Sequence, residues 1–381
     1  MRLTRRGTLL GLGAAMTLGR ASLAFATVPT ERRLVVVLLR GGLDGLAAVV
    51  PVNERNLKDL RGELVPDGLL DLGGRFGLHP ALGALHARFV AGDALAVQAV
   101  ASQDRSRSHF AAQDTLELGT AGHGIADGWL NRAAAALHRP ALAVGAGVPL
   151  LLRGAAPVSS FLPDGPQHPP ADYYAAVLAL HRGDPLTGPA LARALRERGF
   201  TEAVLAGAAL PPQRGAFPTL AAAAGRLLAA PGGPRLAALE LDGWDTHVNQ
   251  NNRLSGVLRQ LDDGLAALRD ALGPVWPQTA VLVVTEFGRT VRVNGAKGTD
   301  HGTATVAFVL GGAVAGGRVA GDWPGLGPGK LFENRDLQPT VDVRSVAKGL
   351  LAQHFRLDAP VLARIFPDSA AAAPMRGLMR A

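Results

Sequence analysis

The 381-residue sequence contains no cysteine. This absence excludes disulfide bonds, thiolate metal ligands and a cysteine nucleophile, so any nucleophile must be an oxygen. The sequence also lacks a cluster of basic residues with interleaved aromatic residues, which is the pattern that nucleic-acid binding uses. We therefore expect no nucleic-acid partner, and we expect the ligands to be small molecules.

Long apolar runs are absent as well, since a membrane span needs ~20 consecutive apolar residues. The N-terminus instead shows Arg5-Arg6, a short apolar run that extends to Leu18, and the small-residue site Ala24-Phe25-Ala26. This order is typical of a cleavable export signal, and the paired arginines indicate the twin-arginine translocase, which exports folded proteins. We predict that residues 1–26 are removed. The mature chain would be periplasmic or extracellular, with no stable membrane span.

Loss of this signal also lowers the formal charge. The value of +8 falls to +4 because four arginines and no acidic residue leave with the segment. So small a charge does not indicate binding to a polyanion. The 48 glycines and 26 prolines show no period, which favours a globular protein with many turns.

Five apolar runs predict strands that are buried on both faces. Between the third and fourth runs, leucine and valine recur at helical spacing from Leu254 to Leu272, which predicts a helix packed on the sheet. Strand, helix and strand in this order predict a three-layer α/β/α fold with a mainly parallel, mixed sheet. The runs are 34–39, 94–100, 236–241, 280–284 and 305–310.

The segment from about residue 141 to 234 differs from the rest, because it is rich in alanine, proline and glycine. Helices are predicted at 173–182 and 191–198. We interpret the segment as a mostly helical insert in a single domain that spans residues 27–381. No G-x-G-x-x-G pattern follows the first strand, so the sequence gives little support for a dinucleotide site.

Ionisable residues gather just after the predicted strands, where open α/β sheets bind their ligands. Each group alone has a structural explanation: Asp44 as a turn residue, Glu286 with Arg289 as an ion pair, and the others as caps or surface pairs. Their shared position at strand ends favours a common site. The residues are Asp44 after the first strand, Asp245 and His247 after the third, and Glu286, Arg289, Asp300 and His301 after the fourth.

Asp245 and His247 are two positions apart, so in an extended segment both side chains point to the same side and could hold one cation. Oxygen and imidazole ligands without sulfur favour zinc, manganese, magnesium or calcium.

A serine-rich segment follows the second predicted strand and leads into a helix. Ser108, with Ser106 as the alternative, stands at the helix start, where unpaired backbone N–H groups favour an anion and an alkoxide nucleophile. Arg105 and Arg107 would add positive charge. The competing interpretation is that the serine is only a helix cap.

Six motifs together resemble the domain of unknown function 1501 family of exported bacterial proteins, which is similar to the alkaline phosphatase and sulfatase superfamily. The resemblance runs from about Leu34 to Pro367. The motifs are LLRGGLDG at 38–45, RSHFAAQD at 107–114, DGWLNR at 127–132, GWDTH at 243–247, TEFGRT at 285–290 and GTDHG at 298–302.

The resemblance implies an alkaline phosphatase-like fold with a two-metal site at the carboxyl edge of the sheet and Ser108 as the nucleophile. Two departures stand out: the superfamily has Asp-His where this chain has Glu286-Phe287, and its first-metal motif has wider spacing than Asp-x-His. By resemblance, Asp44 and Glu286 would bind one divalent ion, and Asp245, His247, His301 and Asp300 the other.

The implied activity is hydrolysis or transfer of a small anionic phosphate or sulfate ester. Ser108 would attack phosphorus or sulfur, and Arg289 or Arg107 would bind the equatorial oxygens. The alternative is a non-catalytic, metal-binding member of the fold that acts as a periplasmic binding or interaction protein.

Overall fold

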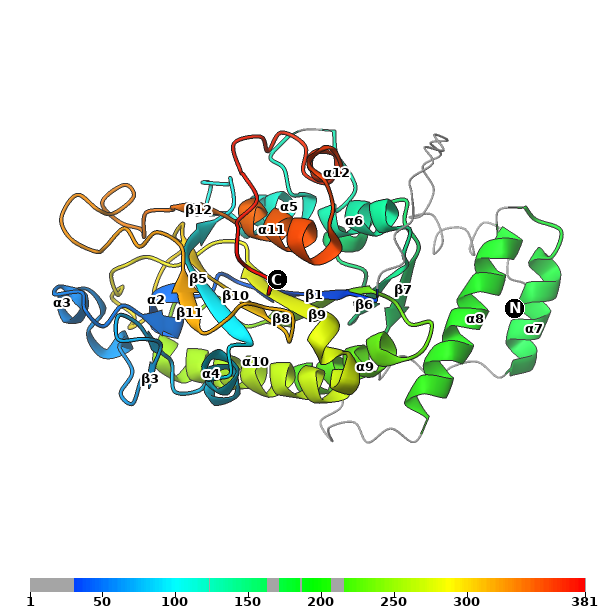
Figure 1. Cartoon of the computed structure of the whole chain (residues 1–381), viewed down its shortest axis with the longest axis horizontal. Helices are drawn as coiled ribbons and strands as arrows, with labels where there is room; N and C mark the ends of the chain where they lie inside the picture. Colours follow the sequence, from blue (N-terminus) through cyan, green and yellow to red (C-terminus); the bar gives the residue numbers. More distant parts are fainter. Residues whose placement is uncertain (1–30, 123, 163–170, 186, 207–215, 381) are drawn as a thin grey trace.

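The computed structural model describes residues 31–122, 124–162, 171–185, 187–206 and 216–380, so the predicted export signal lies outside the described residues. A nine-stranded sheet forms the centre, and helices cover both of its faces (Figure 1). This confirms the predicted three-layer α/β/α fold.

All five predicted strands are present, with ends that differ from the prediction by at most one residue. Among the nine strands of this sheet, β10 alone runs against the others, because it pairs antiparallel with both of its neighbours. The order across the sheet is β11 (Arg318–Ala320), β5 (Ala94–Ala101), β10 (Thr305–Leu310), β9 (Thr279–Thr285), β1 (Arg33–Arg40), β8 (Leu236–Asp242), β6 (Ala141–Val144) and β7 (Val158–Phe161), with β12 (Val341–Asp342) also beside β5.

The central strand β1 shows why the sheet is covered on both faces. Val35, Val37 and Leu39 enter one hydrophobic core, and the alternating residues between them enter the other. Successive side chains of a strand point to opposite faces, so a continuous apolar run needs a helical layer on each side.

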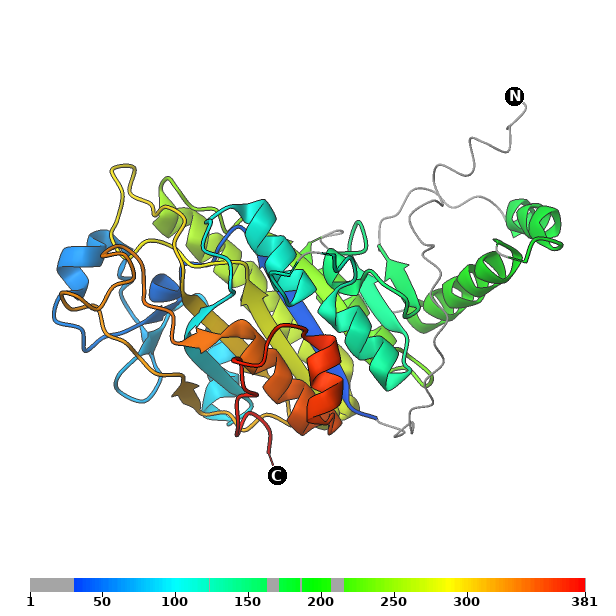
Figure 2. The same cartoon turned by 90° about the horizontal axis from the view of Figure 1, so that it is seen from above.

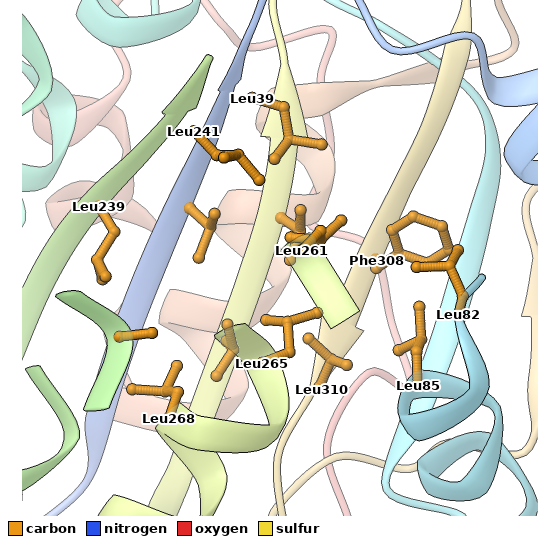
Figure 3. Close-up of a cluster of buried hydrophobic side chains, with 14 of the residues drawn as sticks. Leu39, Leu82, Leu85, Leu239, Leu241, Leu261, Leu265, Leu268, Phe308 and Leu310 are labelled. Atoms are coloured by element: carbon orange, nitrogen blue, oxygen red, sulfur yellow. The ribbon is translucent and has the colours of Figure 1, made fainter. Parts of the chain in front are cut away.

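One face is covered by α4 (Gly83–Val90), α9 (Phe217–Ala229) and α10 (Gln250–Leu272). The predicted leucine stripe of α10 is buried, and Leu261, Leu265 and Leu268 lie against the sheet (Figure 3). Each such leucine contributes roughly 1.5–3 kcal/mol when fully buried. The other face carries α5 (His109–Leu118), α6 (Trp129–Leu137), α11 (Val343–Phe355) and α12 (Ala359–Ile365).

Short elements complete the fold beside the main sheet. They are the three-stranded sheet β2 (Val49–Val50), β4 (Gly77–Leu78) and β3 (Leu70–Asp71), the helices α2 (Gly45–Ala48) and α3 (Leu57–Arg61), and the 3₁₀ turns η1 (Gly62–Leu64), η2 (Leu150–Leu152) and η3 (Gly273–Gln278).

The range predicted as an insert divides into two kinds of structure. Among the described residues of this range, α7 (Ala171–His181) and α8 (Thr187–Leu205) form a helical pair that projects from the side of the fold (Figures 1 and 2). The pair is anchored through α8, because Glu197 accepts from Ser159 Oγ of β7 at 2.8 Å and Phe200 packs against the core. By contrast, β6, β7 and α9 belong to the sheet and its helical layer. The strand β6 has only four residues, all buried, which is too short for its pattern to be told from a helix. None of the described helices is both long and apolar enough to cross a bilayer.

Candidate metal centre

The candidate site lies at one edge of the main sheet. The parallel strands β1, β5, β8 and β9 end at this edge, whereas β10 begins there because it runs the opposite way. Residues that follow four strands therefore meet the residues that precede β10. This arrangement brings His301 to the same place as Asp245.

Asp245, which is 45% exposed, is the centre of the cluster. Its Oδ1 lies 2.9 Å from Nε2 of His247 and 3.2 Å from Nε2 of His301. Its Oδ2 lies 3.6 Å from Nε2 of His109. One ligand atom each from His109, Asp245 and His301 lie within 4.8 Å of one another. Three imidazole rings thus present the same nitrogen to one carboxylate.

The opposite ring nitrogen of each histidine is held by an acceptor. His109 Nδ1 lies 2.9 Å from Oε1 of Glu286, and His247 Nδ1 lies 3.2 Å from Oδ1 of Asp300. His301 Nδ1 lies 2.8 Å from the carbonyl oxygen of Arg107. An ionised carboxylate or a carbonyl only accepts, so each Nδ1 donates and each neutral ring keeps its lone pair on Nε2. Metal-binding histidines are oriented by this kind of partner.

This donor set fits a divalent metal ion. The Nε2 atoms of His247 and His301 are only 3.0 Å apart, so two facing lone pairs would repel unless a proton or a cation lay between them. Imidazole nitrogens with one carboxylate are the ligands that zinc and similar borderline ions prefer.

Arg289 approaches the same carboxylate from inside the protein. Its side chain is fully buried, and its Nη1 lies 2.7 Å from Oδ1 of Asp245. Burial acts to raise the pKa of Asp245, but the hydrogen bond and charge of Arg289 outweigh it, and the pKa is lowered overall. Asp245 therefore remains ionised.

Glu286 lies behind His109 and is almost completely buried. Its carboxylate accepts hydrogen bonds from Gly41 N at 2.8 Å, Gln113 Nε2 at 3.0 Å and Thr285 Oγ1 at 2.8 Å. Burial acts to raise its pKa, yet the hydrogen bonds led by that of His109 lower it. The same hydrogen bond raises the pKa of His109. Glu286 thus fixes His109 in place.

Backbone contact at Gly41 brings the end of β1 against Asp245. A Cβ atom at Gly41 would lie 2.6 Å from the backbone nitrogen of Asp245, and the φ angle of +123° is one that other residues rarely adopt. Only glycine fits at this position, which explains the first of the two glycines in the first motif.

Asp44 occupies a neighbouring buried network and not the histidine cluster. Its Oδ1 accepts from the backbone of Leu46 at 3.1 Å and of Ala47 at 3.2 Å, which caps α2. Its Oδ2 accepts from the side chains of Arg61 and Gln250. Both carboxylate oxygens are therefore already engaged by partners of the chain.

Gln250 connects Asp44 to the candidate centre. Its Oε1 accepts from Thr299 Oγ1 at 2.6 Å, and Arg289 Nε donates to the same hydroxyl at 3.2 Å. The network therefore fixes the buried guanidinium that contacts Asp245.

The start of α5 distinguishes the two candidate serines. Ser106 Oγ donates to Asp104 Oδ1 at 2.8 Å and accepts from Ser108 N at 3.1 Å, so this hydroxyl is used within the turn. Ser108 is the N-cap residue, is partly buried, and makes no side-chain capping bond.

Arg107 takes a left-handed backbone conformation with φ of 58°, which turns its carbonyl toward His301. Its guanidinium is held by Glu333 and by the fully buried Asp336, whose Oδ2 lies 2.9 Å from Arg107 Nε. Asp336 also accepts from Thr303 Oγ1 at 2.8 Å. Asp336 therefore holds Arg107, whose carbonyl contacts the His301 ring, and also Thr303, which is two residues beyond His301 in the chain.

Phe287 closes the cluster on another side. The centroid of its ring lies 4.9 Å from that of His109 and 4.9 Å from that of His301. At the position where the resemblance would place an imidazole ligand, the chain has an apolar ring.

The family described as "Protein of unknown function (DUF1501)" matches residues 73–366. The chain belongs to this DUF1501 family. The match confirms the resemblance seen in the motifs and contains all three histidines of the cluster, whereas the motif with Asp44 precedes it. No match was found among curated proteins.

Several solved structures are similar to this chain at low identity. A protein of the alkaline phosphatase superfamily from Vibrio parahaemolyticus has a TM-score of 0.41 and 11% identity over 86% of this chain and 68% of that one. The soluble domain of lipooligosaccharide phosphoethanolamine transferase A from Neisseria meningitidis has a TM-score of 0.37 and 12% identity, over 74% of this chain and 76% of that one. The phosphonate monoester hydrolase of Agrobacterium radiobacter has a TM-score of 0.37 and 12% identity, over 85% of this chain and 74% of that one.

The structure brings most of the sequence-predicted site residues together. Asp245, His247 and His301 meet directly. Arg289 contacts Asp245 and Asp300 contacts His247, whereas Glu286 joins the cluster through His109. Asp44 lies apart in its own network. His109 was missed as a ligand candidate, although one signal was present: His109 and Gln113 are four positions apart on one face of a helix, and both reach Glu286.

Proposed function

We propose that this chain is a metal-dependent hydrolase or transferase that acts on small anionic phosphate or sulfate esters. The convergence of three histidine Nε2 atoms on the carboxylate of Asp245, each ring held at Nδ1 by an acceptor, carries this proposal. Such orientation of several rings toward one point serves a metal ion better than it serves the stability of the fold, because facing lone pairs repel.

In this proposal His109, Asp245, His247 and His301 hold one divalent ion. The majority of nitrogen ligands favours zinc or a similar borderline ion over magnesium or calcium, which prefer oxygen. Glu286 and Asp300 orient the rings from behind. When bound, the ion would lower the pKa of a nearby hydroxyl and neutralise charge on the ester.

Ser108 is the proposed nucleophile. Its hydroxyl is free of a capping bond, it precedes the ligand His109, and it faces the N-terminus of a ten-residue helix. Unpaired N–H groups there favour the negative charge that develops on the serine oxygen and on the transferred group. Ser106 is the weaker candidate, because its hydroxyl is already bonded on both sides.

Arg289 is the proposed partner of the ester oxygens, since its guanidinium already reaches the central carboxylate. The guanidinium of Arg107 forms ion pairs with Asp336 and Glu333 and contacts no residue of the cluster. We propose that Arg107 acts through its backbone carbonyl, by orienting His301.

One observation favours the alternative of a non-catalytic metal-binding protein. Phe287 places an apolar ring beside His109 and His301, where the resemblance implies an imidazole ligand. A binding or interaction protein would need no second ion.

Export remains part of the proposal. Its support is the order of basic, apolar and small residues in 1–26. The mature chain, proposed to be a single domain of residues 27–381, would meet its substrate outside the cytoplasm.

The test uses the purified mature protein, stripped by a chelator and reloaded with zinc, manganese, magnesium or calcium. We expect at least one metal to restore hydrolysis in a panel of phosphate monoesters, phosphate diesters and sulfate esters. The variant His301→Ala should lose this activity, and His86→Ala, a histidine outside the cluster, should keep it. Metal binding without hydrolysis of any ester would favour the non-catalytic alternative instead.

A further inference from the structure

A groove of about 520 Å³ opens next to the candidate metal centre. It lies between α3 and η1 on one side and the start of α10 and the loop 292–297 on the other. Eleven residues line it: Asp59, Leu60, Gly62, Glu63, Leu64, Asn249, Asn251, Asn252, Arg292, Val293 and Lys297.

The groove and the metal centre share a wall. Asn249 is two residues beyond His247, so their Cα atoms are at most about 7 Å apart. Asn294, in the loop that forms the wall, donates to the carbonyl of His247 at 3.0 Å and to Asp300 Oδ1 at 3.0 Å. The loop that lines the groove is therefore hydrogen-bonded to the backbone of a residue of the cluster.

The charges of the lining balance. Asp59 and Glu63 oppose Arg292 and Lys297, and Lys297 Nζ lies 3.3 Å from Glu63 Oε2. A site built for a phosphate or a polyanion would instead carry an excess of positive charge. The balance favours a neutral ligand.

The polar groups of the lining suit hydroxyl groups. The amides of Asn249 and Asn252 each offer two donors and one acceptor oxygen, whereas Asn251 Nδ2 already donates to the carbonyl of Glu63 at 2.6 Å. A hydroxyl group both donates and accepts, so it matches these amides. Leu60, Leu64 and Val293 add apolar surface, which suits the C–H face of a sugar ring. Within the described residues, the exposed side chains of Asn252 and Arg292 make no hydrogen bond to the protein, so both are available to a ligand.

We infer that this groove binds an uncharged, hydroxyl-rich part of the substrate, namely one or more sugar rings. The reaction at the neighbouring centre rests on the proposed function, whereas sugar binding in the groove does not require it. The substrate would then be a phosphate or sulfate ester of a carbohydrate, with the ester group directed to the metal centre and Ser108.

The test measures binding of three neutral trisaccharides, maltotriose, cellotriose and chitotriose, to the metal-free mature protein by calorimetry. At least one should bind. Asn252→Ala and Arg292→Ala should each weaken binding by roughly tenfold, because each removes hydrogen bonds to the ligand. Arg253→Ala is the matched control, since Arg253 is exposed on the same helix turn but lies outside the groove.

The outcome separates this inference from the proposed chemistry. If His301→Ala binds the sugar as well as the wild type while no ester is hydrolysed by any metal form, the groove assignment stands and the proposed reaction is wrong. The groove assignment itself fails if none of the trisaccharides binds, if Asn252→Ala and Arg292→Ala bind as tightly as Arg253→Ala, or if a neutral tri-alanine peptide binds and the sugars do not.

Discussion

The Nε2 atoms of His247 and His301 lie 3.0 Å apart, and both face the same carboxylate oxygen of Asp245. The two rings come from segments 54 residues apart in the sequence, and each is fixed from behind by a different acceptor. A bound cation would satisfy both nitrogens and the carboxylate at once.

Removal of His301 should therefore weaken metal binding. We expect His301→Ala to bind zinc at least roughly a hundredfold more weakly, and the rise in melting temperature that the metal gives the wild type should disappear, since a ligand stabilises only the state that binds it. Metal titration and thermal unfolding measure both effects. His86→Ala is the control, and equal zinc affinity in the two variants would show that the cluster is not the metal site.

Replacement of Ser108 should separate chemistry from stability. Loss of an activated nucleophile costs several powers of ten in rate. The Ser108 hydroxyl makes no capping bond, and even a capping hydroxyl contributes only about 1 kcal/mol of folding free energy. We expect Ser108→Ala to abolish ester hydrolysis with its metal content intact. Ser106→Ala should retain most activity. Full activity of Ser108→Ala in a steady-state assay would rule out its role as nucleophile.

Asp336 should affect the metal without touching it. In Asp336→Asn, Arg107 loses its buried ionic partner, so the carbonyl that orients His301 is less firmly held. Mutation of an outer-shell partner typically lowers metal affinity roughly 10- to 100-fold. We expect such a decrease, together with a change in the visible spectrum of the cobalt-substituted protein. Glu333→Gln, which removes the exposed partner of Arg107, should leave both almost unchanged, and the same small effect in Asp336→Asn would contradict the positioning role.

The buried His354 should make the protein sensitive to mild acid. Burial lowers the pKa of His354 to about 4 in the folded state, and its Nε2 lies 3.0 Å from the carbonyl of Arg33. An unfolded histidine titrates near 6.5, so below that pH the unfolded state binds more protons. The stability from this group is complete above about pH 6.5 and falls by about 3 kcal/mol as the pH decreases to 4. His354→Gln should show a shallower decline in denaturant unfolding between these pH values, and equal slopes would refute this.

Export can be tested on the precursor. If the paired arginines direct the chain to the twin-arginine translocase, replacement of Arg5 and Arg6 by lysine should leave the full-length precursor in the cytoplasm. Cell fractionation and the apparent mass of the product measure this. Normal processing of the double variant would exclude the route.

The sequence alone was sufficient for the main elements of the sheet. The runs that became β1, β5, β8, β9 and β10 are apolar on both faces, and a strand with no polar face has only one stable place, between two helical layers. The polar residues of the motifs follow those runs, so their position at the sheet edge could be predicted with them. The short β6 gave no such signal.

Only the tertiary structure decided which of these residues share a site. The direction of β10 cannot be read from its apolar pattern, yet it determines that His301, which precedes the strand, lies at the edge where the parallel strands end. His109 lies on a helix, and its position depends on a buried contact with Glu286, 177 residues away. Asp44 has the sequence context of a ligand, but Arg61 and Gln250 surround its carboxylate. A motif specifies which groups are available, whereas the partners of a carboxylate or an imidazole depend on side chains that only folding brings within hydrogen-bonding distance.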